Sequence, residues 1–185
     1  MLGSDLELAR AAARGDAQSF HALIDRHSAE MFRLALSLSG RRADAEDICQ
    51  EAFIGAYRGL PRFDGRSSFK TWLTRIVLRQ SAKVWKKSVW RNTASLDAAT
   101  GLDGASGPRV KEAHGSVSKT DIAMDLTDVI ARLGPDHQQV IVLRELNGLS
   151  YDEIAEALDI PVGTVESRLY RARAELRKLL KDYEL

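Results

Sequence analysis

The feature that most constrains this chain is the spacing of its apolar residues, which recur every three or four positions along most of the sequence. The first clear case is a stripe that begins at Phe20 and stops before Gly40. That spacing places apolar side chains on one face of an α-helix. No stretch alternates apolar and polar residues for long enough to predict a β-sheet. The sequence therefore predicts an all-α fold.

The same spacing predicts further helices, several of them ended by Gly or Pro. Their expected ranges are 44–60, 68–87, 122–133, 136–146, 151–158 and 162–180. Residues 92–120 instead are rich in Ser, Gly, Ala, Thr and Asp and show little periodicity, which is typical of a flexible linker. We therefore expect two small helical domains, residues 1–91 and 121–185, joined by that linker.

Several function classes are disfavoured by what the sequence contains. No apolar run approaches the roughly 20 residues of a membrane span, and the N-terminus lacks the profile of a signal peptide. The single cysteine, Cys49, lies on an apolar stripe and is expected to be a small core residue, while the four histidines show no metal-ligand spacing. Neither a Gly-rich phosphate loop nor a nucleophile–base pair is apparent. We expect a cytoplasmic protein that is not an enzyme, holds no metal or cofactor and does not insert into membranes.

Charge is distributed unevenly, although the formal net charge is only +1. Residues 62–91 hold nine Lys and Arg against one acid, a net of +8, and residues 162–181 carry a net of +4. Two separate basic blocks indicate two contact points on a polyanion such as DNA. The alternative is that each block is simply a solvated helix face.

The clearest local motif is LSYDEIAEALDIPVGTVESRLYRARAELRKLL, residues 149–180. Ser150 and Glu153 form a capping box that starts a short helix, and a tight turn leads into a longer helix with polar and basic residues on its outer side. This pattern is typical of a helix-turn-helix, whose second helix enters the major groove of DNA. An ordinary helical hairpin with a solvated face is the alternative. The candidate DNA-contacting residues are Thr164, Glu166, Ser167, Arg168 and Arg171.

This motif resembles region 4 of the extracytoplasmic-function (ECF) sigma factors, down to its Gly-Thr-Val-x-Ser-Arg-Leu run and the Arg-Ala-Arg that follows. The segment ADAEDICQEAFIGAYRGLPRF, residues 43–63, resembles region 2 of the same family, and RSSFKTWLTRIVLRQSAKVWKK continues it. The likeness covers about residues 16–87 and 122–181. It implies that the helix from Val162 reads the −35 promoter element.

An acidic strip is predicted on the helix of residues 44–60. Asp44, Asp47 and Glu51 fall at i, i+3 and i+7 and so share one face, with Gln50 on its flank and Arg58 extending it. Part of this acidity can be explained as compensation of the helix dipole. The resemblance implies instead a docking strip that grips the β′ clamp helices of RNA polymerase.

Aromatic and basic residues are interleaved along residues 63–85, a combination that suits single-stranded DNA. Phe69 and Trp72 lie on the apolar stripe, where core packing is the expected role. The resemblance implies that this helix and the loop 64–68 capture the unstacked −10 strand. Family members often carry Asn where this chain has Arg79, a departure that bears on the preferred −10 base. The candidate −10 residues are Phe63, Asp64, Ser67, Arg75, Arg79 and Lys83.

Taken together, the motifs predict a sigma factor that directs core RNA polymerase to promoters. The expected partners are the polymerase, through its β′ clamp helices and β flap, promoter DNA and an anti-sigma factor. A stand-alone helix-turn-helix regulator with a helical sensor domain is the main alternative, and it predicts tight duplex binding without polymerase. An interaction module that sequesters another factor is a third, which needs no basic helices. In the free protein the two domains are expected to be either loosely tethered or packed face to face. Charge makes the packed arrangement plausible, because residues 121–159 carry a net charge of −7 and residues 62–91 a net charge of +8.

Overall fold

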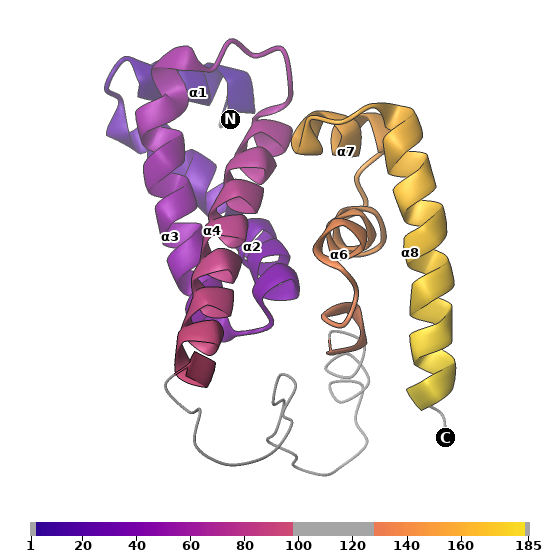
Figure 1. Ribbon diagram of the computed structural model, residues 1–185. Coiled ribbons are helices and arrows are strands. Elements are labelled where there is room, and N and C mark those ends of the chain that lie inside the picture. The colour runs from indigo at the N-terminus through magenta and orange to yellow at the C-terminus, as the bar shows by residue number, and fades with distance from the viewer. Residues whose placement is uncertain (1–2, 98–127, 184–185) are drawn as a thin grey trace, which may run out of the picture.

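The computed structural model describes the backbone of residues 3–97 and 128–183, and within these ranges every regular element is a helix, as the sequence predicts. The N-terminal group consists of α1 (Asp5–Ala13), α2 (Ala17–Ser39), α3 (Arg42–Gly59), the 3₁₀ turn η1 (Leu60–Arg62) and α4 (Phe69–Asp97). The C-terminal group consists of α6 (Pro135–Ile141), the π-helical turn η2 (Val142–Leu146), α7 (Tyr151–Leu158) and α8 (Val162–Tyr183). The two groups lie side by side in Figure 1.

Helix α1 is an element that the apolar spacing did not reveal. Ser4 and Glu7 form a capping box at its start: the Glu7 N–H donates to Ser4 Oγ at 3.3 Å, and the Ser4 N–H donates to Glu7 Oε2 at 2.7 Å. These bonds satisfy two backbone donors that the first turn of a helix leaves unpaired. The S-x-x-E signature was present in the sequence, but nine residues are too few to show a long apolar stripe.

The core of the N-terminal group lies between α2, α3 and α4. Leu23, Leu34, Ile48 and Leu73 are almost completely buried there. Helix α3 faces its neighbours with a row of alanines (Ala45, Ala52 and Ala56), each with no exposed surface. Small side chains let the helices approach closely, so that a larger residue in this row would overpack the core.

The C-terminal group packs α6 and α7 against one side of α8. Val140, Leu143 and Ile154 from the first helices meet Val165 and Leu169 from α8, and all five are buried. The expected helix over 136–146 is present but ends as a π-helical turn, closed by a hydrogen bond of 2.8 Å from the Asn147 side chain to the Val142 carbonyl. The helix expected over 122–133 lies largely outside the described residues.

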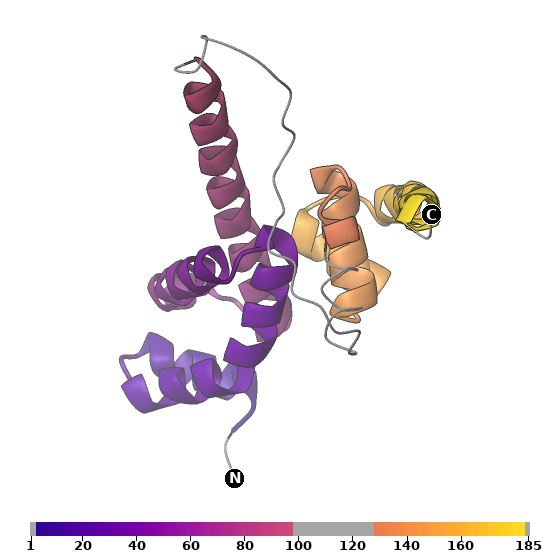
Figure 2. The ribbon, with the colours of Figure 1, turned by 90° about the horizontal axis from the view of Figure 1, so that it is seen from below.

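Helix α4 is ten residues longer than the spacing predicted. It continues from Phe69 to Asp97, into the segment that composition assigned to the linker. The sequence offers no Gly or Pro between Gly65 and Gly101, so nothing in the chain breaks the helix earlier. Seen from below, α4 extends beyond the helices that pack around its first half (Figure 2). The remainder of the expected linker, residues 98–120, lies outside the described residues.

The two groups of helices touch through α4 and α7 and through α2 and η2 (Figures 1 and 2). The Arg75 side chain donates a hydrogen bond to the backbone carbonyl of Glu156, and Arg75 Nη2 lies 3.9 Å from Glu156 Oε1. Gln138 Nε2 donates to the carbonyl of Ser37 at 3.3 Å. Of the two arrangements that the sequence left open, the structure has the domains packed face to face.

Candidate nucleic-acid interface

The helix-turn-helix is built by local hydrogen bonds at the positions that the sequence indicated. The Ser150 N–H donates to Glu153 Oε2 at 2.8 Å, and the Glu153 N–H donates to Ser150 Oγ at 3.2 Å, which completes the capping box of α7. Asp159 ends α7 in the left-handed conformation, with φ of 57°. Asp tolerates this conformation better than most residues. The chain then turns through Ile160 and Pro161, and α8 begins at Val162.

The outer face of α8 presents the candidate −35 residues to solvent. Glu166, Ser167 and Arg171 are exposed, while Val165, Leu169 and Ala172 on the opposite side are buried. Thr164 is half-buried, and its carbonyl accepts a hydrogen bond of 3.0 Å from Ser167 Oγ. Because the inner side is locked into the core, the outer side chains are held in a defined direction for contact with a groove.

Tyr170 also belongs to this face, and sequence reasoning missed it. Its exposed fraction is 76%, the largest among the exposed large apolar residues of the described chain. It follows Glu166 by four positions and Ser167 by three, so helical spacing alone puts it beside them. An exposed aromatic side chain on a helix-turn-helix can contact a thymine methyl group or a backbone phosphate.

Arg168 is placed differently from the prediction that it lies on the outer surface. Its guanidinium lies 2.8 Å from Asp136 on α6, and its side chain is only 26% exposed. Arg173 is likewise paired, through two hydrogen bonds to Glu145 at 2.6 and 3.0 Å. Glu145, and secondly Tyr151, raises the pKa of Arg173 by hydrogen bonding. Two of the basic side chains of this segment, Arg168 and Arg173, are therefore paired with acids of the same domain.

In the N-terminal group, the loop between η1 and α4 holds three of the candidate −10 residues. Asp64 Oδ1 accepts from the Arg66 N–H at 3.1 Å, a turn that Gly65 permits with φ of 75°. Behind the loop, Phe63 packs against Phe69 and Trp72, with ring centroids 5.9 and 5.0 Å away. This confirms the expected packing role of Phe69, which is 2% exposed. Asp64 and Ser67 remain at the surface, exposed and half-buried respectively.

A cavity of about 650 Å³ opens between this loop and the N-terminal helices. Phe63 and residues 65–69 form one side, and the other side is formed by Ser4, Asp5, Leu6 and Arg26. The walls combine aromatic rings with hydroxyl, carboxylate and guanidinium groups. Such a mixture suits a planar polar ring, which needs both stacking and hydrogen bonding.

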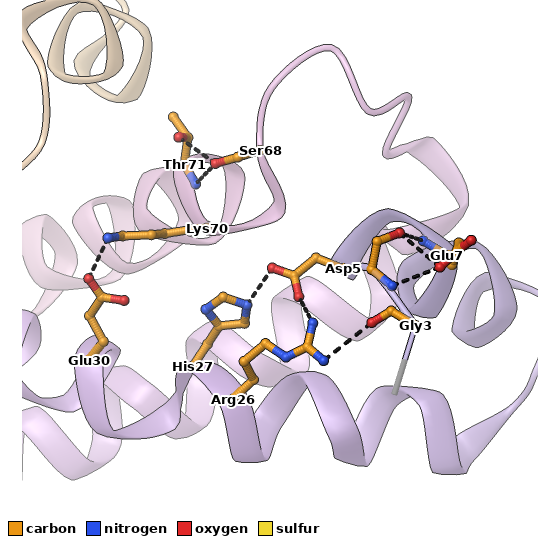
Figure 3. Close-up of polar contacts among 10 residues, drawn as sticks. Gly3, Asp5, Glu7, Arg26, His27, Glu30, Ser68, Lys70 and Thr71 are labelled. Carbon is orange, nitrogen blue, oxygen red and sulfur yellow. Dashed lines mark hydrogen bonds and ion pairs between the residues drawn. The ribbon is translucent and has the colours of Figure 1, made fainter. Parts of the chain in front are cut away.

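Polar contacts hold α1 in place as the back wall of this cavity (Figure 3). Asp5 pairs with Arg26, and its second oxygen lies 2.8 Å from Nε2 of His27, a side chain that is almost fully buried. A separate ion pair of 2.6 Å joins Lys70 to Glu30 and so ties the start of α4 to α2. Buried and partly buried charges are stable only when paired in this way.

The bases of α4 do not all share one environment. Arg79 and Lys83 are exposed. Arg75 instead lies in the contact with α7, and its Nε is buried without a hydrogen-bond partner. The structure therefore brings two of the three candidate basic residues to the surface and holds the third, Arg75, half-buried against the C-terminal group.

The acidic strip on α3 is exposed at Asp47, Gln50, Glu51 and Arg58. Asp44 is half-buried and lies 3.7 Å from Arg41, so part of its charge is compensated locally. Asp47 and Glu51 also line a groove of about 290 Å³ whose other wall is formed by α4, including Gln80 and Lys83. The acidic strip and the basic face of α4 thus meet along one groove.

Two further observations concern chemistry at other positions. Cys49 is half-buried against the core, and burial raises its pKa from 9.0 to about 11. Within the described residues, no group of three or more His, Cys, Asp or Glu side chains is arranged to hold a metal ion. None of the helices in that part of the chain has the length and apolarity needed to span a membrane.

Comparison with known proteins gives matches over both groups of helices. The family description "Sigma-70 region 2" matches residues 23–91, and "Sigma-70, region 4" matches residues 123–176. The ECF RNA polymerase sigma-E factor of Escherichia coli (strain K12) is 38% identical over 176 residues, which cover 92% of this chain and 91% of that protein. The ECF RNA polymerase sigma-E factor of Haemophilus influenzae is 36% identical over 175 residues, 92% of each chain.

Solved structures share the same fold. CnrH, solved in complex with the cytosolic domain of CnrY, matches with a TM-score of 0.73 and 26% identity, covering 97% of this chain and 99% of CnrH. The sigma factor RpoE of Bartonella quintana, solved in complex with the anti-sigma factor NepR, matches with a TM-score of 0.65 and 24% identity. That second match covers 89% of this chain and 98% of the other, and it supports the fold alone.

Proposed function

This chain belongs to the ECF sigma factors of the sigma-70 family, which direct RNA polymerase to promoters, and we propose how three of its surfaces divide that work. The outer face of α8 reads the −35 element. The loop before α4, together with the exposed basic side chains of α4, captures the −10 strand. The acidic strip of α3 docks on the β′ clamp helices of the polymerase, and the C-terminal group meets the β flap.

The observation that carries this proposal is the construction of α8. One side is locked into the core by Val165 and Leu169, while Glu166, Ser167 and Arg171 project into solvent. A helix held in this way can enter a major groove without reorganising its own domain. The proposed −35 set is therefore Thr164, Glu166, Ser167 and Arg171, with Tyr170 added and with Arg168 as a residue that must first leave Asp136.

The −10 assignment is supported by the cavity between the loop and α1. A flipped base leaves the stack at a cost of a few kcal/mol, and a preformed pocket offsets that cost. The cavity of about 650 Å³ is large enough for a base with its sugar, and Phe63 and Ser67 stand on its wall. Arg79 and Lys83 are exposed further along α4, where they can follow the phosphates of the strand.

The docking role of α3 is supported by charge and exposure. Asp47 and Glu51 are exposed on the same face, and in the described part of the chain neither forms an ion pair with a Lys or Arg side chain. Unpaired acids on one helix face repel one another slightly, and a basic partner removes that repulsion. Asp44, Gln50 and Arg58 complete the proposed contact.

We further propose that the protein works in the cytoplasm, acts by binding alone and leaves the chemistry to the polymerase. An anti-sigma factor is a proposed partner: CnrH, which shares this fold at 26% identity, was solved in complex with another protein, the cytosolic domain of CnrY. Because α4 contacts α7, the two groups of helices that carry the proposed promoter contacts lie against each other, and one partner could bind both of them.

Run-off transcription tests the function directly. Core polymerase with genomic DNA fragments should initiate at defined start sites only when the protein is added. The same fragments should bind the free protein weakly, because two modest basic surfaces gain effective concentration only on a scaffold. Nanomolar, sequence-specific binding to duplex DNA without polymerase would favour the stand-alone regulator instead.

A further inference from the structure

One acidic residue stands on the DNA-facing side of a basic helix. Glu166 is the fifth residue of α8 and is exposed. The other glutamate of this helix, Glu175, forms a hydrogen bond with His137, with 2.6 Å between Glu175 Oε2 and His137 Nδ1. Among the described side chains, none forms a hydrogen bond or ion pair with the carboxylate of Glu166. Its charge is therefore available to whatever lies against α8.

A carboxylate at this position is unfavourable for binding DNA in general. The phosphates repel it, and the surrounding face carries Tyr170, Arg171 and Arg177, which suit a polyanion better. Glu166 contributes favourably only where a donor on the DNA replaces the water that the carboxylate loses. Its effect thus depends on the sequence of the DNA.

The major-groove edges of the four bases determine which DNA meets that condition. A carboxylate can only accept hydrogen bonds. Cytosine presents the N4 amino donor with no acceptor in the groove, whereas guanine presents two acceptors and thymine presents an acceptor and a methyl group. Adenine places its donor beside an acceptor, which weakens a contact with an anion.

We propose that Glu166 determines specificity at one base pair of the −35 element, by accepting a hydrogen bond from cytosine N4 and excluding guanine and thymine from that strand position. This inference rests on the proposed −35 role of α8 and deepens it by naming a preferred base. Glu166 thereby acts as much by rejection as by attraction, because a desolvated carboxylate facing an acceptor is costly.

A promoter library tests the proposal. Transcription is run with core polymerase on templates in which the −35 element is randomised and the −10 element is held constant. Wild-type protein should favour cytosine at one position by about tenfold over guanine or thymine. Glu166→Ala should lose that preference at the same position only, and transcription from the guanine and thymine templates should rise.

Glu166→Gln gives a second readout, since an amide can both donate and accept and pairs with adenine N6 and N7. The preference should move from cytosine toward adenine. Glu175→Gln is the matched control, on the same helix but bonded to His137, and should leave the base preference unchanged. The rise at guanine and thymine templates is a gain that loss of folding cannot produce.

Two results overturn the inference. One is a Glu166→Ala protein whose base preference matches wild type at every position, and the other is a change spread evenly over all positions. Failure of the wild-type protein to support any transcription is a separate result, because it would contradict the sigma-factor activity itself and not the reading by Glu166.

Discussion

Arg168 and Arg171 stand three positions apart on α8, yet their guanidinium groups have different surroundings. Arg171 is exposed on the outer face, whereas Arg168 reaches back to Asp136. Both lie in the basic block that indicated DNA binding, and a count of charges cannot separate them. Burial and pairing can, because an arginine already bonded to a carboxylate must give up that bond before it contacts a base.

Arg171→Ala should therefore lower transcription that depends on the −35 element, by about 1–3 kcal/mol if the contact is to a base. Arg168→Ala should act mainly on stability, through the lost pair with Asp136, by up to about 1 kcal/mol because the pair is partly exposed. Run-off assays and thermal unfolding of both variants measure these effects. A double-mutant cycle with Asp136→Ala measures the coupling between the two side chains. If the stability effects of the two substitutions are additive, and Arg168→Ala removes the dependence on the −35 element, Arg168 contacts the DNA and the pair with Asp136 matters little.

Cys49 makes a prediction about pH. Burial raises its pKa from 9.0 to about 11, so folding favours the protonated thiol. Stability from this source is complete below pH 9 and is lost as the pH rises through 11. At pH 8 the native protein should hold about a hundredfold less thiolate than the unfolded chain, and iodoacetamide should alkylate it correspondingly more slowly. Equal alkylation rates for native and urea-unfolded protein would contradict the raised pKa.

At the scale of a single element, the two sides of α3 have different surroundings. Its alanine row packs against the core with no exposed surface, and its acids project outward. Changes on the outer side can therefore alter binding while leaving the core intact. This separation makes α3 a good place to test partner binding by charge reversal.

Asp47→Lys and Glu51→Lys should each weaken binding to core polymerase, and the double variant should abolish it, because attraction to a basic surface becomes repulsion. Pull-down with core enzyme measures the binding, and circular dichroism checks the fold. Asp25→Lys is the matched control, since Asp25 is exposed on α2 and makes the same change of charge. Unchanged pull-down by the double variant would remove the docking role from this strip.

Apolar spacing was enough to predict the long helices and the helix-turn-helix. Helix α7 begins and ends where the sequence placed it, because the Ser150 capping box and the turn at Asp159 are local signals. The partner of Arg168 could not be predicted, since Asp136 is 32 residues away and only the folded chain brings them together. The cavity beside the loop before α4 could not be predicted for the same reason, because residues of and just before α1 form one of its walls.

On the scale of the whole molecule, the two groups of helices contact each other through α4 and α7 and through α2 and η2. Opposite charges on residues 62–91 and 121–159 favour this arrangement, and Arg75 and Glu156 are where those charges meet. Exposed parts of such an attraction weaken with salt, since the Debye length is about 8 Å at physiological ionic strength.

Small-angle scattering of the free protein should give a compact radius of gyration at low salt, within a few ångströms of the ~16 Å expected for a compact chain of this length. The radius should grow as salt is added. Glu156→Lys should expand the protein even at low salt by placing two cations together. Asp152→Lys makes the same change of charge on the same helix without touching the pair with Arg75, and it should expand the protein less. An extended radius that ignores salt would rule the closed arrangement out.

If polymerase binds only molecules in which α4 and α7 have separated, the contact at Arg75 also sets how much of this protein is needed before it acts. Its Nε–H is buried without a partner, so the closed arrangement is less stable than a fully bonded one, and any partner that separates α4 from α7 returns this group to water. If closure leaves 1% of molecules open, the apparent affinity for polymerase falls about a hundredfold. Glu156 is not among the residues proposed to contact DNA. A substitution there would then change the concentration of this protein at which transcription begins, and the promoters that it recognises would stay the same.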